Sequence, residues 1–332
     1  MKQVLVTGGM GFIGSHTVVS LMEAGFRPVI FDNLCNSSED VLEGIARITG
    51  EKPLFIKGDV TSAADLKALF TGHNIDAVIH FAALKAVGES SEKPLEYYHN
   101  NIGGLICLLE AMQEHGVRNV VFSSSATVYG SAAHMPVDED TPLPPAMSPY
   151  GSTKQMGERI LFDASIFRSI CLRYFNPIGA HPSGHIGELP LGVPNNLVPY
   201  VTQAAAGLRK SLTIFGEDYQ TPDGTAVRDY LHVMDLAEAH VAALNRLQQV
   251  QDRPHWEVFN LGTGKPISVK TLVETFEQVN GVLVPRVMGP RRQGDVPELW
   301  ANPGRAKEVL GWNAEHSLAA MLRDAWNWQQ KL

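Results

Sequence analysis

Two residues in the middle of the chain have types and a spacing suited to acid–base chemistry. Tyr150 and Lys154 are four residues apart, so on a helix they lie one turn apart on the same face. Pro149 suits the first helical position, because its missing N–H would have no partner there. A free tyrosine titrates near about pH 10, but a neighbouring ammonium group favours the phenolate. The pair is therefore a candidate general base.

A run of hydroxyl side chains, Ser123-Ser124-Ser125, precedes this pair and follows an apolar stretch. A hydroxyl at the end of a strand there could meet the same substrate oxygen as Tyr150. Without the serines, the Tyr–Lys spacing has a second interpretation, since it also occurs on helices with no catalytic role.

A glycine-rich segment near the amino terminus, Thr7–Gly14, lies between an apolar run at 4–6 and an amphipathic stretch at 12–24. Counted from Gly9 it is G-x-G-x-x-G, and counted from Gly8 it is G-x-x-G-x-x-G. Between a strand and a helix, such glycines allow a tight turn and a close approach to pyrophosphate. The helix start then attracts the anion. An ordinary turn is the alternative interpretation.

An acidic residue supports the dinucleotide interpretation. Asp32 ends a second apolar run, 28–31, and lies eighteen residues after Gly14. In dinucleotide-binding sheets an acid near this position binds the ribose of NAD. Asp32 would repel the extra phosphate of NADP and no arginine follows it, so we expect NAD rather than NADP.

The elements that must position these residues alternate along the first half of the chain. Apolar runs predict strands at 4–7, 28–32, 54–57, 77–81, 119–123 and 169–174, and helical stretches between them include 12–24, 63–70, 94–115 and 149–162. This alternation predicts an α/β fold of the Rossmann type, a doubly wound parallel sheet with helices on both faces. Ligands of such sheets lie beyond the carboxyl ends of the strands.

A change of composition predicts a domain boundary. Residues 177–194 contain eight Gly or Pro in eighteen positions. We therefore expect a dinucleotide-binding domain over 1–176 and a second, smaller, mixed α/β lobe over 177–332. The apolar run 258–261 predicts a late strand, so that about 229–262 returns to the first domain.

Composition narrows the class of protein. The chain has 332 residues, 44% of them hydrophobic, which suffices for one large or two moderate cores. No apolar run approaches the roughly 18 residues that span a membrane. The amino terminus enters a strand directly, so we expect no signal peptide. A net charge of −8 argues against a nucleic-acid partner.

The metal-binding and redox residue types are dispersed. Cys35, Cys107 and Cys171 form no C-x-x-C motif, which favours free thiols in the reducing cytoplasm. His181 and His185 lie in a glycine- and proline-rich loop, and no H-E-x-x-H motif occurs. We therefore expect no bound metal.

These motifs together resemble those of the extended short-chain dehydrogenase/reductase family. The resemblance lies first in Thr7–Gly14, Ser123–Gly130 and Tyr150–Lys154. It narrows to the sugar-nucleotide epimerases of that family at Phe31–Ser37, His80–Ser90, Arg173–Pro177, Pro194–Leu197, Arg228–Val233 and Pro290–Asp295.

The resemblance implies interconversion of UDP-glucose and UDP-galactose by inversion at carbon 4 of the sugar, through a 4-keto intermediate, with a tightly bound NAD. In this interpretation Tyr150 removes the proton of the 4-hydroxyl group. Lys154 tunes Tyr150 and binds the nicotinamide ribose, while Ser125 hydrogen-bonds the same sugar oxygen.

The resemblance also implies which residues bind the two nucleotides. Those for NAD are Gly8, Gly11, Phe12, Ile13, Gly14, Asp32, Asn33, Asn36, Ser37, Asp59, Val60, Phe81, Ala82, Ala83, Lys85, Asn100, Ser123, Tyr150, Lys154 and Tyr174. Those for the UDP-sugar are Lys85, Ser125, Tyr150, Phe175, Asn176, Asn196, Leu197, Phe215, Arg228, Tyr230, Arg292, Asp295 and Leu299. Arg291–Arg292 has an alternative interpretation as a solvated surface patch.

Leu299 departs from the family pattern. Relatives restricted to plain sugars have tyrosine there, and relatives that accept N-acetylated sugars have a smaller residue. A leucine leaves open whether this chain is also a UDP-N-acetylhexosamine epimerase.

Two other functions compete. A 4,6-dehydratase of the same family has Asp-Glu directly after the reacting hydroxyl, where this chain has Ala126-Thr127. A non-catalytic NAD-sensing scaffold has typically lost the Tyr or the Lys, and both are present here.

The resemblance further implies a homodimer that pairs the helices at 94–115 and 149–162 through residues such as Ile102, Leu105, Leu109 and Ile160; the alternative is that these residues face the sheet.

Overall fold

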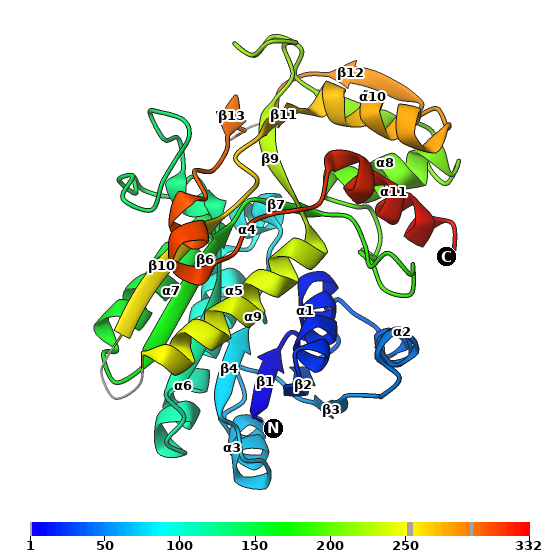
Figure 1. Cartoon of the computed structure of the whole chain (residues 1–332). Coiled ribbons are helices and arrows are strands. Elements are labelled where there is room, and N and C mark those ends of the chain that lie inside the picture. The colour runs from blue at the N-terminus through cyan, green and yellow to red at the C-terminus, as the bar shows by residue number, and fades with distance from the viewer. Residues whose placement is uncertain (1, 251–254, 293–294) are drawn as a thin grey trace.

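A seven-stranded parallel sheet lies at the centre of the computed structural model, which describes residues 2–250, 255–292 and 295–332. From one edge to the other its strands are β10 (His255–Leu261), β6 (Arg168–Tyr174), β5 (Asn119–Ser125), β4 (Ala77–His80), β1 (Gln3–Thr7), β2 (Arg27–Asp32) and β3 (Leu54–Lys57) (Figure 1). The order β3-β2-β1-β4-β5-β6 is that of the Rossmann fold, with β10 added beside β6.

Helices cover both faces of this sheet, because successive side chains of a strand point to opposite faces. Val4 and Val6 of β1 join a core with α1 (Phe12–Glu23), α2 (Asp40–Thr49) and α9 (Val233–Gln249). Leu5 joins the other core, with α3 (Ala63–Gly72), α6 (Gly104–Glu114) and α7 (Pro149–Asp163). The sheet is therefore buried on both sides, as parallel sheets are.

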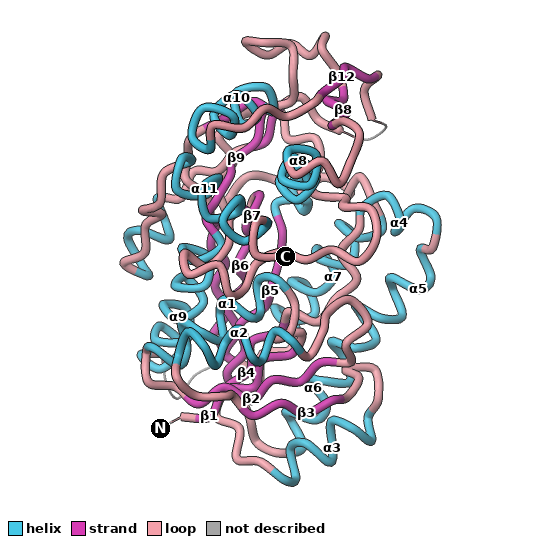
Figure 2. The backbone as a smooth tube through the Cα atoms, turned by 90° about the vertical axis from the view of Figure 1, so that its right-hand side faces the viewer, coloured by secondary structure: helices cyan, strands magenta, loops and turns pink. Residues whose placement is uncertain are grey.

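The carboxy-terminal part forms a smaller mixed layer above the strand ends (Figures 1 and 2). One sheet joins β7 (Asn176–Ile178), β9 (Val227–His232), β11 (Pro266–Ser268) and β13 (Glu298–Leu299), and another pairs β8 (Leu212–Phe215) with β12 (Arg286–Gly289). Three helices pack on them in a third core: α8 (Leu197–Ala205), α10 (Val269–Asn280) and α11 (Leu318–Gln329).

The predicted fold class is confirmed, and the structure refines its elements. The stretch expected as one helix over 94–115 consists of α5 (Pro94–Tyr98), a π-turn (His99–Gly103) and α6. Helix α2 and the short α4 (Val87–Glu92) were not predicted. Within the described ranges, no helix is long and apolar enough to cross a membrane.

Two residues expected at a dimer interface lie in the core instead. Leu105 is fully buried and Leu109 is 5% exposed, both against the sheet. Ile160 also packs against this core, and Ile102 is half-buried. The interpretation that these residues face the sheet is therefore correct for Leu105 and Leu109.

Candidate active site

The start of α7 carries the Tyr–Lys pair. The helix begins at Pro149, and the Ser148 hydroxyl caps it by accepting the Gly151 N–H at 3.1 Å. Tyr150 and Lys154 are 9% and 4% exposed. The Lys154 ammonium donates to the Ser123 carbonyl oxygen at 2.7 Å and lies 5.7 Å from the centroid of the Tyr150 ring. Lysine, tyrosine and the end of β5 therefore meet in one buried group.

Three hydroxyls, those of Ser123, Ser125 and Tyr174, complete this group at the ends of β5 and β6. The Ser125 oxygen accepts the Thr127 N–H at 3.2 Å and the Thr127 hydroxyl at 3.0 Å, which leaves the Ser125 proton free to donate. Ser123 Oγ is hydrogen-bonded to the hydroxyl of Tyr174, and Ser125 pairs with Tyr174 in the sheet register. The structure thus brings together Ser123, Ser125, Tyr150, Lys154 and Tyr174.

Burial dominates the electrostatics of this group. It raises the pKa of Tyr150 to about 12, against the opposing effect of a hydrogen bond with Ser125. It lowers the pKa of Lys154 to about 8, while the Glu158 carboxylate acts in the opposite direction. The expected lowering of the Tyr150 pKa by Lys154 is therefore not found in the protein alone: loss of hydration raises this pKa, and the opposing effect comes from the Ser125 hydrogen bond.

The glycine segment forms a closely packed cradle at the start of α1. Gly8 has φ +70°, and a Cβ on it would lie 2.7 Å from the Ala82 nitrogen. A Cβ on Gly14 would lie 2.3 Å from the Gly8 oxygen. Gly11 precedes Phe12 and Ile13 as the N-cap, without a capping side chain. The exposed N–H groups and the helix dipole suit the diphosphate of a dinucleotide.

Acidic and amide side chains flank this cradle at the ends of β2 and β3. Asp32 accepts the N–H of Met10 at 3.0 Å and of Leu34 at 2.9 Å, and the Ser37 hydroxyl at 3.2 Å. A carboxylate has about four acceptor positions, so one remains for a ribose hydroxyl. Asn33 bridges to Asp59 at 2.9 Å.

The other predicted NAD residues line the same strand ends. Val60 is buried, Phe81, Ala82 and Ala83 follow β4 and are half-buried, Asn100 lies in the π-turn, and Asn36 is exposed.

The predicted phosphate-binding residues form a second cluster in the smaller layer. The Asp295 carboxylate accepts a hydrogen bond from the Arg292 guanidinium at 2.9 Å and lies 3.6 Å from the Arg228 guanidinium. The Arg292 guanidinium in turn lies 5.3 Å from the centroid of the Phe215 ring. Gln293 and Gly294, part of the motif 290–295, lie outside the described residues. Arg291 instead contacts Asp218 at 2.7 Å, so the two arginines have separate environments.

A third cluster of polar side chains surrounds Glu188, a residue that was not predicted for the site. The Glu188 carboxylate accepts Asn196 at 2.6 Å and Lys85 at 3.4 Å. Asn196 is the N-cap of α8, whose first residue is Leu197. Among the described residues no hydrogen bond joins Lys85 to the Tyr150 group, so Lys85 lies with a carboxylate rather than with the reacting pair.

Leu299 joins the two layers of the site. It lies beside Arg228 in the pairing of β13 with β9, and it packs against the cluster that contains Ala126 and Phe175. Asn176 of β7 is exposed and pairs with the buried Tyr230 of β9. Leu299 therefore packs on the cluster that includes the apolar residues directly following Ser125 and Tyr174.

Sequence reasoning missed an amide that ties this region together. Asn101 is buried in the π-turn, accepts the Leu84 N–H at 2.9 Å and donates to Thr153 at 3.1 Å. Thr153 in turn donates to the Tyr150 carbonyl at 2.7 Å. The available indication was a polar residue inside an apolar helical stretch; π-turns of this kind frequently occur at functional sites.

The sheet order, the glycine cradle and the buried Ser–Tyr–Lys group define an extended short-chain dehydrogenase/reductase. A family model described as GDP-mannose 4,6 dehydratase matches residues 5–325. UDP-glucose 4-epimerase of Yersinia pestis is 51% identical, over 99% of this chain and 97% of that protein. The chain belongs to the UDP-glucose 4-epimerase family.

Solved structures of UDP-glucose 4-epimerases agree with this family assignment. The chain resembles a UDP-glucose 4-epimerase from Stenotrophomonas maltophila, solved with NAD and formylated UDP-arabinopyranose, at a TM-score of 0.96 and 50% identity over 100% of this chain and 98% of that one. An enzyme of the same name from Bifidobacterium longum, solved in complex with NAD+ and UDP, gives a TM-score of 0.95. It is 45% identical in sequence, over 99% of this chain and 98% of that one.

Proposed function

We propose that this enzyme interconverts UDP-galactose and UDP-glucose by inverting carbon 4 of the sugar, with NAD as cofactor. The observation that carries the proposal is the buried group of Ser125, Tyr150 and Lys154 at the strand ends, in a chain about half identical to UDP-glucose 4-epimerases along nearly its whole length.

In the proposed reaction, Tyr150 takes the proton of the sugar 4-hydroxyl and Ser125 donates a hydrogen bond to the same oxygen. Lys154 holds the nicotinamide ribose and supplies positive charge that favours the phenolate. NAD, when bound, accepts the hydride from carbon 4 and returns it to the other face of the 4-keto sugar. Burial of the group excludes water, which protects the keto intermediate.

The remaining predicted residues are proposed to hold the two nucleotides. The glycine cradle, Asp32, Asn33 and Asp59 suit the adenosine diphosphate part of NAD, because no residue larger than glycine fits at Gly8 or Gly14 without displacing backbone. Arg228 and Arg292 are proposed for the UDP diphosphate, since arginine forms a rigid fork for phosphate oxygens. Asp295, which now pairs with both, is proposed to exchange to a ribose hydroxyl.

We also propose a division into an NAD-binding domain, residues 1–176 with about 229–262, and a UDP-sugar-binding domain in the rest of 177–332. Its support is the packing of α9 on the core beside α1 and the pairing of β10 with β6, which place both elements on the large sheet.

A dehydratase is the closest competing function, and the matching family model carries that description. Elimination of water needs an acid and a base beside the sugar. Ala126 and Thr127 follow Ser125, and the Thr127 hydroxyl is engaged with Ser125 at 3.0 Å. The site therefore favours epimerisation.

The deciding experiment is to incubate the pure protein with UDP-galactose and to quantify UDP-glucose. Formation of UDP-glucose without added NAD is expected, because the hydride returns to the same substrate and no cofactor exchange is needed. A 4-keto-6-deoxy product would instead identify a dehydratase.

The bound cofactor is tested separately, by denaturing the protein and identifying the released dinucleotide. We expect NAD, since Asp32 repels the 2′-phosphate of NADP. Release of mostly NADP, or of no nucleotide, would contradict a tightly held NAD.

We further propose that the enzyme acts in the cytoplasm as a homodimer. The three cysteines are free thiols, which fits a reducing compartment. Apolar side chains are exposed on α5, α6 and α7, where the family resemblance implies pairing: Leu95, Ile106, Met156 and Phe162.

A further inference from the structure

A buried ion pair lies next to the reacting residues and has no part in the proposed chemistry. Arg173 of β6 and Glu158 of α7 bind each other through two contacts, of 2.6 and 2.9 Å. Their side chains are 4% and 5% exposed, and within the described ranges no other ion pair has both partners so deeply buried. Burying two charges costs desolvation free energy, so the pair requires a reason.

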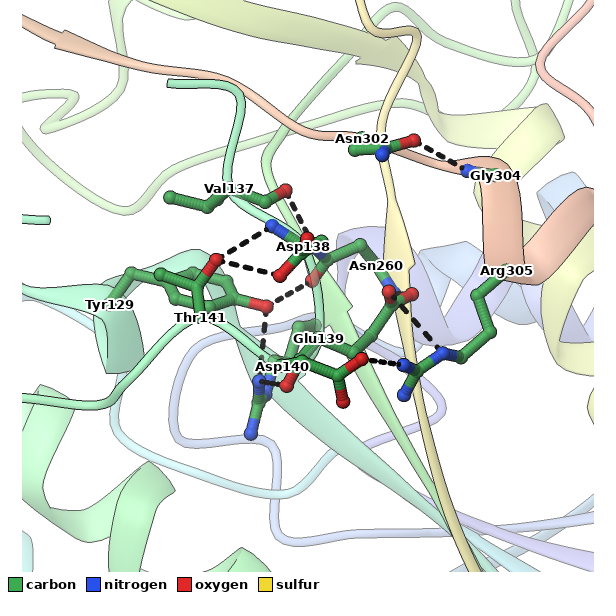
Figure 3. Close-up of polar contacts among 11 residues, drawn as sticks. Tyr129, Val137, Asp138, Glu139, Asp140, Thr141, Asn260, Asn302, Gly304 and Arg305 are labelled. Atoms are coloured by element: carbon green, nitrogen blue, oxygen red, sulfur yellow. Dashed lines mark hydrogen bonds and ion pairs between the residues drawn. The ribbon is translucent and has the colours of Figure 1, made fainter. Parts of the chain in front are cut away.

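Further hydrogen bonds tie this pair to β5 and to the segment after it. Ser124 donates to Glu158 at 2.5 Å. Arg173 also donates to the Tyr129 hydroxyl at 3.0 Å, and Tyr129 donates to Asn260 of β10 at 2.6 Å. Figure 3 shows Tyr129 bonded to Asn260, whose backbone N–H donates to Glu139 and whose side chain donates to the Val137 carbonyl oxygen. The ion pair is therefore the centre of a buried polar network.

The network touches each segment that carries a reacting residue. Glu158 lies one turn beyond Lys154 on α7, and Lys154 lies one turn beyond Tyr150. Ser124 is the neighbour of Ser125, and Tyr129 ends the short turn that begins after Ser125. A shift of Glu158 would therefore move the Tyr–Lys pair relative to the serine.

We propose that Glu158, held by Arg173 and Ser124, is a positioning residue that fixes α7 against β5 so that Tyr150 and Lys154 stay aligned with Ser125. This inference rests on the proposed epimerase activity. An error of about 1 Å in such an alignment costs roughly 10²-fold in rate, which explains why a costly buried pair is placed at this point.

The Glu158 carboxylate also contributes charge, because it favours the ammonium form of Lys154. The other groups that face Lys154 are Tyr150 on the same helix, the Ser123 carbonyl of β5 and His80 of β4. Burial lowers the pKa of His80 to about 3, so this histidine is neutral. On β6, Tyr174 faces Tyr150 and Arg173 faces Glu158. Loss of the Glu158 charge would therefore leave Arg173 as an uncompensated cation at the turn of α7 that follows Lys154.

The test compares Glu158→Gln, which keeps the shape and removes the charge, with Glu158→Asp, which keeps the charge and shortens the side chain. Glu257→Gln is the matched control: Glu257 forms a similar two-contact pair with Arg246, at 2.9 and 3.1 Å, between β10 and α9. We expect Glu158→Gln to lower kcat at least about 10-fold and to change KM less than about 2-fold. Glu158→Asp should keep the wild-type pH profile at reduced kcat, and Glu257→Gln should behave as wild type.

A second readout does not depend on turnover. The ultraviolet absorbance of tyrosinate is titrated for each protein and for its Tyr150→Phe counterpart, and the difference isolates Tyr150. We expect Glu158→Gln to move this titration to lower pH. Tyr150, with a pKa of about 12, titrates after Lys154, whose pKa is about 8, has lost its charge, and the uncompensated Arg173 then favours the phenolate. A wild type without epimerase turnover would overturn the proposed function, whereas the titration would still test the role of Glu158.

Wild-type kcat and titration in a folded Glu158→Gln protein would overturn the proposal, and so would an equal loss in Glu257→Gln. If Glu158→Gln does not fold, Ser124→Ala replaces it, because this change keeps the ion pair and removes only its bond to β5. A fall in kcat at constant KM then supports the proposal, and an unchanged kcat contradicts it.

Discussion

At the scale of single residues, the site must hold a phenol that gives up its proton inside a buried group. Burial raises the pKa of Tyr150 to about 12, so the phenol is protonated at neutral pH in the protein alone. The Ser125 hydrogen bond and nearby positive charge favour the phenolate. Binding of cofactor and substrate must therefore stabilise the Tyr150 phenolate, which burial disfavours. This restricts proton transfer to the assembled complex.

Replacing Tyr150 by phenylalanine tests this role. The change removes one hydroxyl and keeps the ring, so we expect UDP binding to survive while turnover falls about 10²–10⁴-fold. Turnover of UDP-galactose and the dissociation constant of UDP are to be measured for both proteins. More than about a tenth of wild-type turnover in the variant would refute the general-base role.

The pH dependence follows from Lys154. Burial lowers its pKa to about 8, so raising the pH through this value removes the positive charge that favours the phenolate. We expect kcat to decline above about pH 8. Lys154→Arg should be slower but should lose this decline, because arginine stays charged. A kcat that rises steadily to about pH 10 in the wild type would contradict the assignment.

At the scale of elements, the strands of the large sheet were predictable, whereas the strands of the smaller layer and several helical segments were not. The central parallel strands are buried on both faces, so each appears in the sequence as a short apolar run. The bounds of β1, β2 and the more exposed edge strand β3 agree with the predictions within one residue. Helix α4 has one buried residue, Ser90, and therefore shows no apolar period. The π-turn before α6 depends on contacts of Asn101 with Leu84 and Thr153 that no local pattern contains.

The site also contains residues that could be predicted from the sequence and residues that could not. Tyr150, Lys154 and the glycines were predictable because their chemistry depends on local spacing. Glu158 and Arg173 were not, because a charged residue on a helix or strand normally faces solvent, and only the folded chain shows that these two bury each other.

The short strand β13 carries the prediction on substrate size. It places Leu299 against the cluster with Ala126 and Phe175, beside the residues proposed to hold the sugar. An N-acetyl group needs additional room while the keto sugar turns over, so we expect slow turnover of UDP-GlcNAc. Leu299→Cys should raise that turnover at least about 10-fold, since such volume changes in a binding site are worth roughly 10–200-fold.

The measurement compares turnover of UDP-galactose and of UDP-GlcNAc in wild type and variant. Leu283→Cys is the control, because Leu283 is 79% exposed. Equal wild-type rates on the two sugars would refute the role of Leu299 as a barrier.

At the scale of the whole molecule, apolar side chains are exposed on the outer surface of α6 and α7. Two of the residues expected to pair two copies of the chain, Leu105 and Leu109, belong to the core instead. Exposed apolar side chains remain on the outer surface of the same helices: Ile106 is 41% exposed, Met156 47% and Phe162 54%. An amphipathic helix normally presents polar residues to solvent, so this surface fits contact with a second copy.

The last prediction is that this surface forms the homodimer. Ile106→Glu and Phe162→Glu place charges where the proposed interface would bury them, and burying an unpaired charge is strongly unfavourable. We expect light scattering at micromolar concentration to give a dimer mass for the wild type and a monomer mass for these variants. Leu283→Glu should remain dimeric, because Leu283 lies in the carboxy-terminal layer, between α10 and β12. A monomeric wild type, or variants that all stay dimeric, would exclude this surface as the interface.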